Sequence, residues 1–144
     1  MAVAPSTHSA GQPLHARLAA ARAAAFAPAA ELARTALEQA GVPSARIDAV
    51  LVVSSTLFHG PGLDCHIITA LGLRPDVARL CVGYMGCAAG CIGLRAAADY
   101  CAAHPGAHAL LLCVEVSSAH ATHADSLNDV ILHAIFADGA AACV

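Results

Sequence analysis

The 144-residue chain is 58% hydrophobic, 12% charged and 3% aromatic, and its formal net charge at pH 7 is −3. This composition excludes a disordered polyelectrolyte, and the length fits one domain with a real hydrophobic core. All seven basic residues are arginines and ten residues are acidic, so we expect no nucleic-acid partner. The apolar runs 47–53 and 109–116 fall far short of the roughly 20 residues of a membrane span, so we expect no membrane partner either.

The seven cysteines are an odd number, and most lie in apolar runs, as Cys81 and Cys113 do. This pattern predicts buried free thiols in a reducing compartment rather than a disulfide scaffold. The N-terminal residues lack the apolar segment of a secretory signal, so we expect a cytoplasmic protein. The C-x₃-C and H-x₂-H spacings at 87–91 and 120–123 do not match the usual zinc-ligand spacing, and we predict no metal site.

Residues 1–13 have no hydrophobic period and predict a disordered leader before one domain, 14–144. The alanine-rich stretch that follows is typical of helix. Because proline is tolerated only in the first turn of a helix, Pro28 predicts two helices, 14–26 and 28–40.

The second of these helices is predicted to end at Gly41, since glycine readily takes the left-handed conformation of a helix C-cap. Its apolar side is formed by Leu32, Ala36 and Leu37, continued by Ala40, which predicts an amphipathic helix packed on a core.

Beyond this point, continuous apolar runs alternate with helical patterns, which is typical of an α/β fold with a mostly parallel, buried sheet. The predicted elements are a strand at 47–55, a helix at 64–72, a strand at 78–84, a helix at 87–103, a strand at 108–116, a helix at 127–135 and a strand at 138–144.

Cys87 is the strongest candidate for chemistry. The strand before it turns through Gly86 directly into the helix that it begins. Unpaired backbone N–H groups and the positive end of the helix dipole favour a thiolate there, which is what a nucleophile requires. The local pattern equally allows a buried cysteine beside the packing glycines Gly90 and Gly93. We expect Cys91, one turn further on, to lie in the core.

Five segments together resemble type III polyketide synthases, the chalcone/stilbene synthase family. They are VVSSTLFHGPGLD (52–64), LGLRPDVAR (71–79), GCAAGCIGLRAAADY (86–100), PGAHALLLCVEVSS (105–118) and IFADGAAA (135–142). The likeness extends from about Ala29 to Val144 with almost no gaps. It implies a thiolase-like layered fold, of which this chain would be a partial N-terminal half-domain.

The resemblance also implies an activity and a site. Cys87 falls on the cysteine that accepts a starter acyl group from coenzyme A, and malonyl-CoA then extends this group by decarboxylative condensation. Phe136 falls on the gatekeeper phenylalanine, and Ser55, Ser117 and His120 fall on residues that line the pocket. The coenzyme A thioesters are substrates, and no resident cofactor is implied.

Two departures from the family pattern affect these expectations. Gly60 replaces a methionine that many members extend into the partner subunit, which puts that contact of the full-length homodimer in doubt. The catalytic histidine and asparagine belong to the second half of the fold, and the first strand of the family is not visible. We therefore expect a truncated member, inactive alone, whose sheet has open edges and an uncovered hydrophobic face.

Two alternative functions remain possible from the sequence. A ketoacyl synthase III-like condensing enzyme would share the cysteine elbow, and a non-catalytic interaction subunit would complete its fold with a partner. We interpret Glu115 as a structural hydrogen-bonding residue and Asp138 as the cap of a turn before Gly139.

Overall fold

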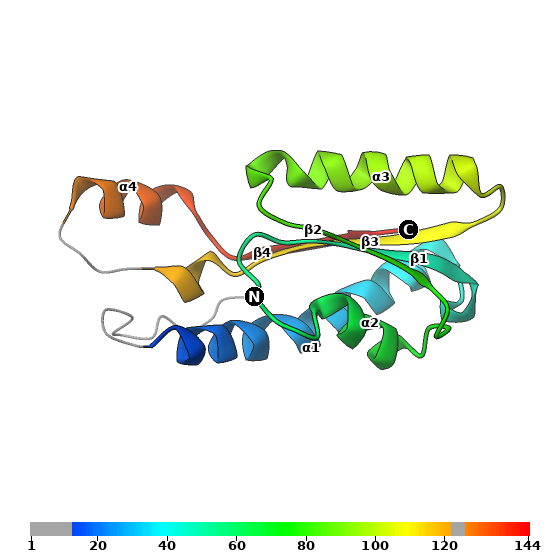
Figure 1. The fold of residues 1–144 in the computed structure, drawn as a ribbon, viewed down its shortest axis with the longest axis horizontal. Coiled ribbons are helices and arrows are strands. Elements are labelled where there is room, and N and C mark those ends of the chain that lie inside the picture. Colours follow the sequence, from blue (N-terminus) through cyan, green and yellow to red (C-terminus); the bar gives the residue numbers. More distant parts are fainter. Residues whose placement is uncertain (1–12, 122–125) are drawn as a thin grey trace.

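The computed structural model describes residues 13–121 and 126–144, so the predicted leader lies outside the described residues except for Pro13. One sheet is sandwiched between helices (Figure 1). Its strands follow the order β2-β1-β3-β4; β1 is parallel to both β2 and β3, and β4 is antiparallel to β3. The strands are β1 (Ile47–Val53), β2 (Ala78–Val82), β3 (His108–Glu115) and β4 (Gly139–Cys143). The predicted α/β class and mostly parallel sheet are confirmed.

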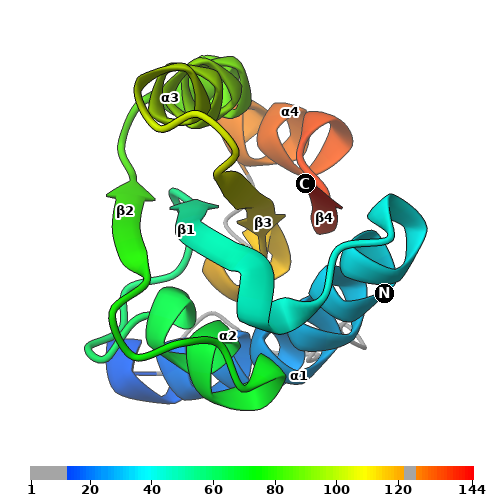
Figure 2. The ribbon, with the colours of Figure 1, turned by 90° about the vertical axis from the view of Figure 1, so that its right-hand side faces the viewer.

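The helices form a layer on each side of the sheet (Figure 2). One face is covered by α1 and α2 and the other by α3, while α4 extends beyond the end of the sheet (Figure 1). Their bounds are α1 (Leu14–Ala40), α2 (Leu63–Leu71), α3 (Ala89–Ala103) and α4 (Leu127–Ile135). No helix within the described ranges is both long enough and apolar enough to cross a membrane.

The centre of the sheet is formed by β1 and β3, which pair directly from Ile47 opposite His108 to Val53 opposite Cys113. Because side chains alternate along a strand, these two strands contribute to two cores. One faces α1 and contains Val50 and Val52, and the other faces α3. The strands at the centre are therefore covered on both faces, and the expected uncovered face is not found there.

The two outer strands, β2 and β4, are less buried than the apolar sequence predicts. Four of the five residues of β2 are exposed, and so are four of the five in β4. The expectation of open edges is confirmed. An edge strand has a neighbour on one side only, so an apolar sequence does not ensure burial there.

The first helix is continuous, and the predicted break at Pro28 is wrong. Proline costs one backbone hydrogen bond and strains the preceding turn. The residues around it, Ala25, Phe26, Ala29 and Ala33, are all buried in the core on the α1 side of the sheet. We attribute the continuity to this packing, which spans both sides of the proline.

The predicted end of α1 is confirmed. Gly41 has a φ of 65°, and its N–H donates to the carbonyl of Glu38. Of the predicted apolar side, Ala36 and Leu37 are buried, Leu32 is half-buried and Ala40 is exposed.

The cysteines are all free, as predicted, but they are less buried than their sequence context indicates. Cys81 is exposed because β2 is an edge strand, and Cys113 is half-buried. The pKa of the Cys113 thiol is raised, chiefly by burial.

The packing of α3 on the sheet depends on Gly93. A Cβ built there would lie 2.6 Å from Val53 Cγ2 and 3.0 Å from Leu111 Cδ1. Both neighbours are buried, and valine has little freedom about χ1, so moving either side chain away costs free energy. Gly90, one turn earlier, has Cys113 Sγ at 3.7 Å, an ordinary contact distance.

We predict that Gly93→Ala lowers the free energy of unfolding by about 1–3 kcal/mol, because the added methyl overpacks the interface between α3 and the sheet. Gly90→Ala is the matched control: it leaves stability unchanged or raises it by up to about 1 kcal/mol through helix propensity. Urea unfolding of both variants measures the difference. Equal effects of the two substitutions would contradict this account of the packing.

Asp48 ties the amino ends of the central strands to the α2–β2 turn. Its carboxylate accepts the His108 N–H at 3.0 Å and the Arg74 guanidinium at 2.9 Å. The His108 N–H, followed by Arg74, lowers the pKa of Asp48 below its ordinary value of 3.8. The unfolded chain therefore takes up this proton first as the pH falls, so the stabilisation is present above pH 3.8 and is lost through the lowered folded pKa.

We predict that Asp48→Asn lowers the unfolding temperature at pH 7, and that its difference from the wild type narrows as the pH falls below 4. Thermal unfolding from pH 7 to pH 3 measures this. Asp76→Asn removes an exposed partner of the same arginine and is expected to have little effect. A difference that stays constant with pH would argue against the linkage.

Candidate functional site

The predicted site residues lie at one end of the strands, which we call the carboxyl edge because the three parallel strands end there. The carboxyl ends of parallel strands lie together, and ligands of α/β proteins bind at that edge. Ser55 follows β1, Cys87 follows β2, and Ser117 and His120 lie in the 3₁₀ helix η3 (Ser117–His120) that follows β3. Phe136 precedes β4, whose Gly139 pairs with Glu115 at the end of β3. These five residues therefore belong to segments at the same end of the sheet, the end beyond which α4 extends in Figure 1.

Cys87 lies on a tight elbow between β2 and α3. Tyr84 and Gly86 have left-handed backbone conformations, with φ of 60° and 69°. Cys87 is in the 3₁₀ helix η2 (Gly86–Ala88), and the α-helix begins at Ala89, two residues later than predicted. A left-handed conformation costs a residue with a side chain about 1–2 kcal/mol, which explains glycine at position 86. The predicted order of strand, elbow and helix is confirmed.

The Cys87 thiol is exposed, and within the described residues it has no hydrogen-bond or ion-pair partner. Cys91, predicted to lie in the core, is exposed as well, because it lies outside the buried side of α3. The buried face of α3 is formed instead by residues such as Ala89 and Gly93.

Glu115 joins the ends of the two central strands. One carboxylate oxygen accepts the Ser55 N–H at 2.8 Å, and the other accepts the Thr56 hydroxyl at 2.5 Å. The same hydroxyl accepts the N–H of buried Val116 at 2.8 Å. The interpretation of Glu115 as a structural hydrogen-bonding residue is confirmed. Thr56 was missed by sequence reasoning, although a Ser-Ser-Thr run after a buried strand is a usable signal.

His120 is held by the same loop. Its Nε2 lies 2.7 Å from the Thr56 carbonyl, and its ring packs edge-on against Phe58 with centroids 5.6 Å apart. The Ser55 hydroxyl is buried and has no hydrogen-bond partner among the residues that the structure describes. Both residues therefore belong to the loop system that closes this edge, although no bound molecule tests their role as pocket-lining residues.

Asp138 connects β4 to η3 and does not act as the predicted turn cap. Its two carboxylate oxygens accept the backbone N–H and the hydroxyl of Ser118, at 2.8 Å and 2.7 Å. Phe136 follows the last residue of α4 and is about half exposed, at 49%. Its role as a gatekeeper stays a prediction.

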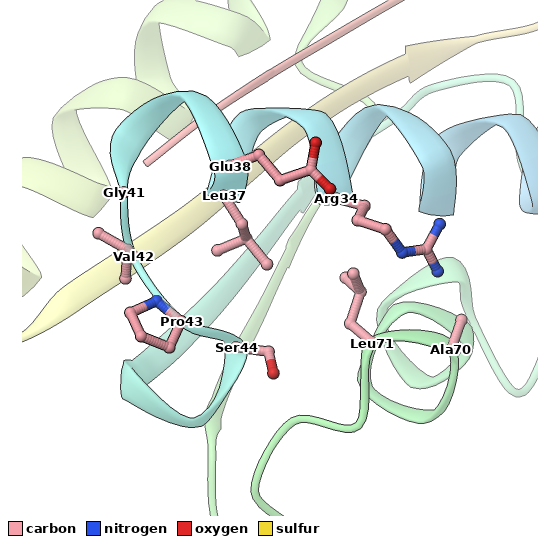
Figure 3. A pocket seen from close by; sticks show the side chains of 9 residues that line it. All are labelled: Arg34, Leu37, Glu38, Gly41, Val42, Pro43, Ser44, Ala70 and Leu71. Carbon is pink, nitrogen blue, oxygen red and sulfur yellow. The ribbon is translucent and has the colours of Figure 1, made fainter.

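A hollow of about 440 Å³ lies at the opposite edge of the sheet (Figure 3). It is formed where α1 and α2 end, and none of the five predicted site residues lines it. Its lining residues are Arg34, Leu37, Glu38, Gly41, Val42, Pro43, Ser44, Ala70 and Leu71. Across residues 13–121 and 126–144, no group of three or more His, Cys, Asp or Glu side chains could hold a metal ion.

Comparison with known proteins identifies the family. The profile described as "Chalcone and stilbene synthases, N-terminal domain" matches residues 3–144. The chain belongs to this family. Ketoacyl synthase III-like enzymes, the alternative condensing enzymes, gain no support from this match.

Two curated relatives illustrate the similarity. The chain is 44% identical to "Alpha-pyrone synthesis polyketide synthase-like Pks18" of Mycobacterium tuberculosis over 107 residues, which cover 73% of this chain and 27% of that protein. It is 39% identical to the 1,3,6,8-tetrahydroxynaphthalene synthase of Streptomyces peucetius over 109 residues, which cover 76% of this chain and 29% of that protein. The chain thus spans less than a third of the length of these relatives.

Solved structures agree. PKS-I of Ectocarpus siliculosus superposes with a TM-score of 0.86 at 44% identity, covering 96% of this chain and 40% of that one. The germicidin synthase of Streptomyces coelicolor, a type III polyketide synthase, superposes with a TM-score of 0.87 at 34% identity, covering 94% and 36%. The thiolase-like layered fold is confirmed.

We predict that Thr56→Val lowers the free energy of unfolding by about 1–3 kcal/mol, because the buried Val116 N–H and the Glu115 carboxylate both lose a partner. Thr56→Ser keeps the hydroxyl and is expected to stay close to the wild type. Chemical unfolding of the pair measures the difference, and a Ser variant as unstable as the Val variant would show that the methyl group matters instead.

Proposed function

We propose that this chain carries the nucleophile-bearing part of a type III polyketide synthase, with Cys87 as the acyl acceptor. The observation that carries the proposal is the place of Cys87: an exposed thiol on the elbow between β2 and α3, at the carboxyl edge of the sheet. The family match over residues 3–144 supports it.

In the loading step, the Cys87 thiolate attacks the carbonyl carbon of an acyl-CoA thioester. A new C–S bond forms, the bond to the coenzyme A sulfur breaks, and the coenzyme A thiolate leaves and takes up a proton. In the extension step, malonyl-CoA loses CO₂, and the resulting enolate attacks the Cys87 thioester. A C–C bond forms and the Cys87 thiolate is released.

Ser55, Ser117 and His120 would line the acyl pocket, with Phe136 at its mouth. The Ser55 N–H donates to Glu115 and the His120 ring contacts the Thr56 carbonyl, which supports this assignment because both residues are held at the carboxyl ends of the central strands. His120 offers a bulkier and more basic group than the small hydroxyl residue familiar at that position. In this proposal the protein is a cytoplasmic homodimer at full length, coenzyme A thioesters are its substrates, and no resident cofactor takes part.

The two steps make different demands on the protein. Loading needs an accessible thiol, whereas condensation also needs hydrogen-bond donors for the enolate oxygen, and losing one such donor typically costs about 100- to 1,000-fold in rate. In the described residues Cys87 has no hydrogen-bonded histidine. We therefore expect the 144-residue chain to become acylated without forming condensation products.

We predict that incubation with acyl-CoA adds one acyl group to the chain at Cys87, detected by intact-protein and peptide mass spectrometry. Cys87→Ser abolishes the adduct. Cys91→Ser is the matched control, since it removes an exposed thiol one turn further along the same segment and retains the adduct. Product analysis after adding malonyl-CoA is expected to find no condensation product.

Two outcomes would count against the proposal. Acylation spread equally over the exposed cysteines would show that Cys87 has no special role. No acylation at any cysteine, by a folded chain, would favour a non-catalytic interaction subunit.

A further inference from the structure

Three aromatic rings meet at the carboxyl edge, each from a different loop. Phe58, in the loop after β1, lies 5.7 Å from the Tyr84 ring of the elbow and 5.6 Å from the His120 ring of η3, measured between centroids. The Tyr84 pair is tilted by 30°, and the His120 pair is edge-on at 87°. Rings at such separations attract each other beyond the effect of burial alone. Phe58 therefore connects the cysteine elbow to the predicted pocket.

The elbow has an unusual need for support. Tyr84 is the one described residue other than glycine with a positive φ, at 60°, and the residue is 80% exposed. Such a conformation persists only where surrounding contacts favour it. Burial supplies little support at this exposed residue, and the structure pairs the Tyr84 ring with the Phe58 ring.

Phe58 itself is held firmly. The Ser54 hydroxyl accepts the N–H groups of Thr56 and Leu57, which closes the turn just before Phe58. Thr56 is in turn bound to Glu115 and Val116 of the neighbouring strand end. The Phe58 ring thus extends from a hydrogen-bonded loop and packs on the Tyr84 ring of the elbow.

We infer that Phe58 is a positioning residue for Cys87: its ring holds Tyr84, and through Tyr84 the elbow that presents the thiol. The inference rests on the proposed function of Cys87 as acyl acceptor. Phe58 contacts no reacting atom in this role and acts only through the backbone of the elbow.

Three substitutions of Phe58 distinguish the effect of the aromatic ring from the effect of side-chain size. Phe58→Ala removes both, Phe58→Leu keeps the bulk without a ring, and Phe58→Tyr keeps the ring. Because Phe58 is 40% exposed, the Leu and Tyr variants are expected to fold as the wild type does. Thermal unfolding establishes this for each variant.

The test is amide hydrogen exchange by mass spectrometry on a peptide covering residues 83–88. We expect Phe58→Ala and Phe58→Leu to accelerate exchange there by about 2- to 10-fold, the factor that an aromatic pair typically contributes. Phe58→Tyr restores the wild-type rate. A peptide covering residues 94–103 of α3 is the internal control and stays unchanged in all variants.

The second readout is the rate of Cys87 acylation by acyl-CoA, which falls by a similar factor in the Ala and Leu variants and recovers in the Tyr variant. Unchanged elbow exchange in Phe58→Leu would overturn the inference, even if Cys87 is acylated. Accelerated exchange in a chain whose wild-type Cys87 is not acylated would instead retain the ring contact and reject the proposed function.

Discussion

The direct pairing of β1 with β3 is the constraint on which the rest of the molecule depends. Both strands are buried, and their register brings Val53 opposite Cys113, so the two chains leave the sheet side by side. Only because of this register can Glu115 reach the backbone N–H of Ser55 and the hydroxyl of Thr56. The loops that carry the predicted site are thus fixed by the same pairing that forms the two hydrophobic cores.

Much of this fold could be predicted from the sequence, because its central elements have strong local signals. The run 47–53 is apolar throughout, which a strand covered on both faces requires, and Gly41 ends a helix for a reason local to its backbone. The break at Pro28 was predicted wrongly because the local cost of proline is visible in the sequence, whereas the packing of α1 around it is not. Tertiary contacts decided that case.

Burial at the edges illustrates the same limit. The residues of β2 are as apolar as those of a central strand, yet Cys81 is exposed because β2 is an outer strand of the sheet that the described residues form. Cys91 lies within an apolar helical segment, but only one side of α3 meets the sheet, and Gly93 marks that side. Hydrophobic content therefore predicted the helices and strands correctly, but it did not predict which of their residues are buried against other elements.

In the candidate site, too, some residues could be predicted from the sequence and others could not. Cys87 could be found because a glycine at the junction of a strand and a helix is a local signal. Thr56 and Phe58 were missed because their importance comes from groups about 60 residues away, at Glu115 and His120. A short sequence motif does not indicate a contact with a residue that far away along the chain. Such residues become visible only when the loops are placed together.

The carboxyl edge is therefore held by contacts of unequal strength. Glu115 binds β1 to β3, and Asp138 binds β4 to η3, both through hydrogen bonds to a carboxylate, which typically contribute about 1.5–3 kcal/mol each. The elbow that bears Cys87 is tied to the β1 loop by a backbone bond from Ser54 to Val82 and by a ring contact, and aromatic pairs contribute about 0.5–1.5 kcal/mol.

This difference in contact strength matters most for Cys87, the proposed nucleophile. The elbow takes its shape from the left-handed backbone at Tyr84 and Gly86, and it meets the β1 loop through the Ser54–Val82 backbone bond and the ring contact with Phe58. The loops after β1 and β3 are joined by hydrogen bonds to the Glu115 carboxylate, whereas the elbow that bears Cys87 meets the β1 loop through the Phe58 ring. In the proposed role of Cys87 as acyl acceptor, the position of its thiol would therefore depend on Phe58, a residue that does not contact the acyl group.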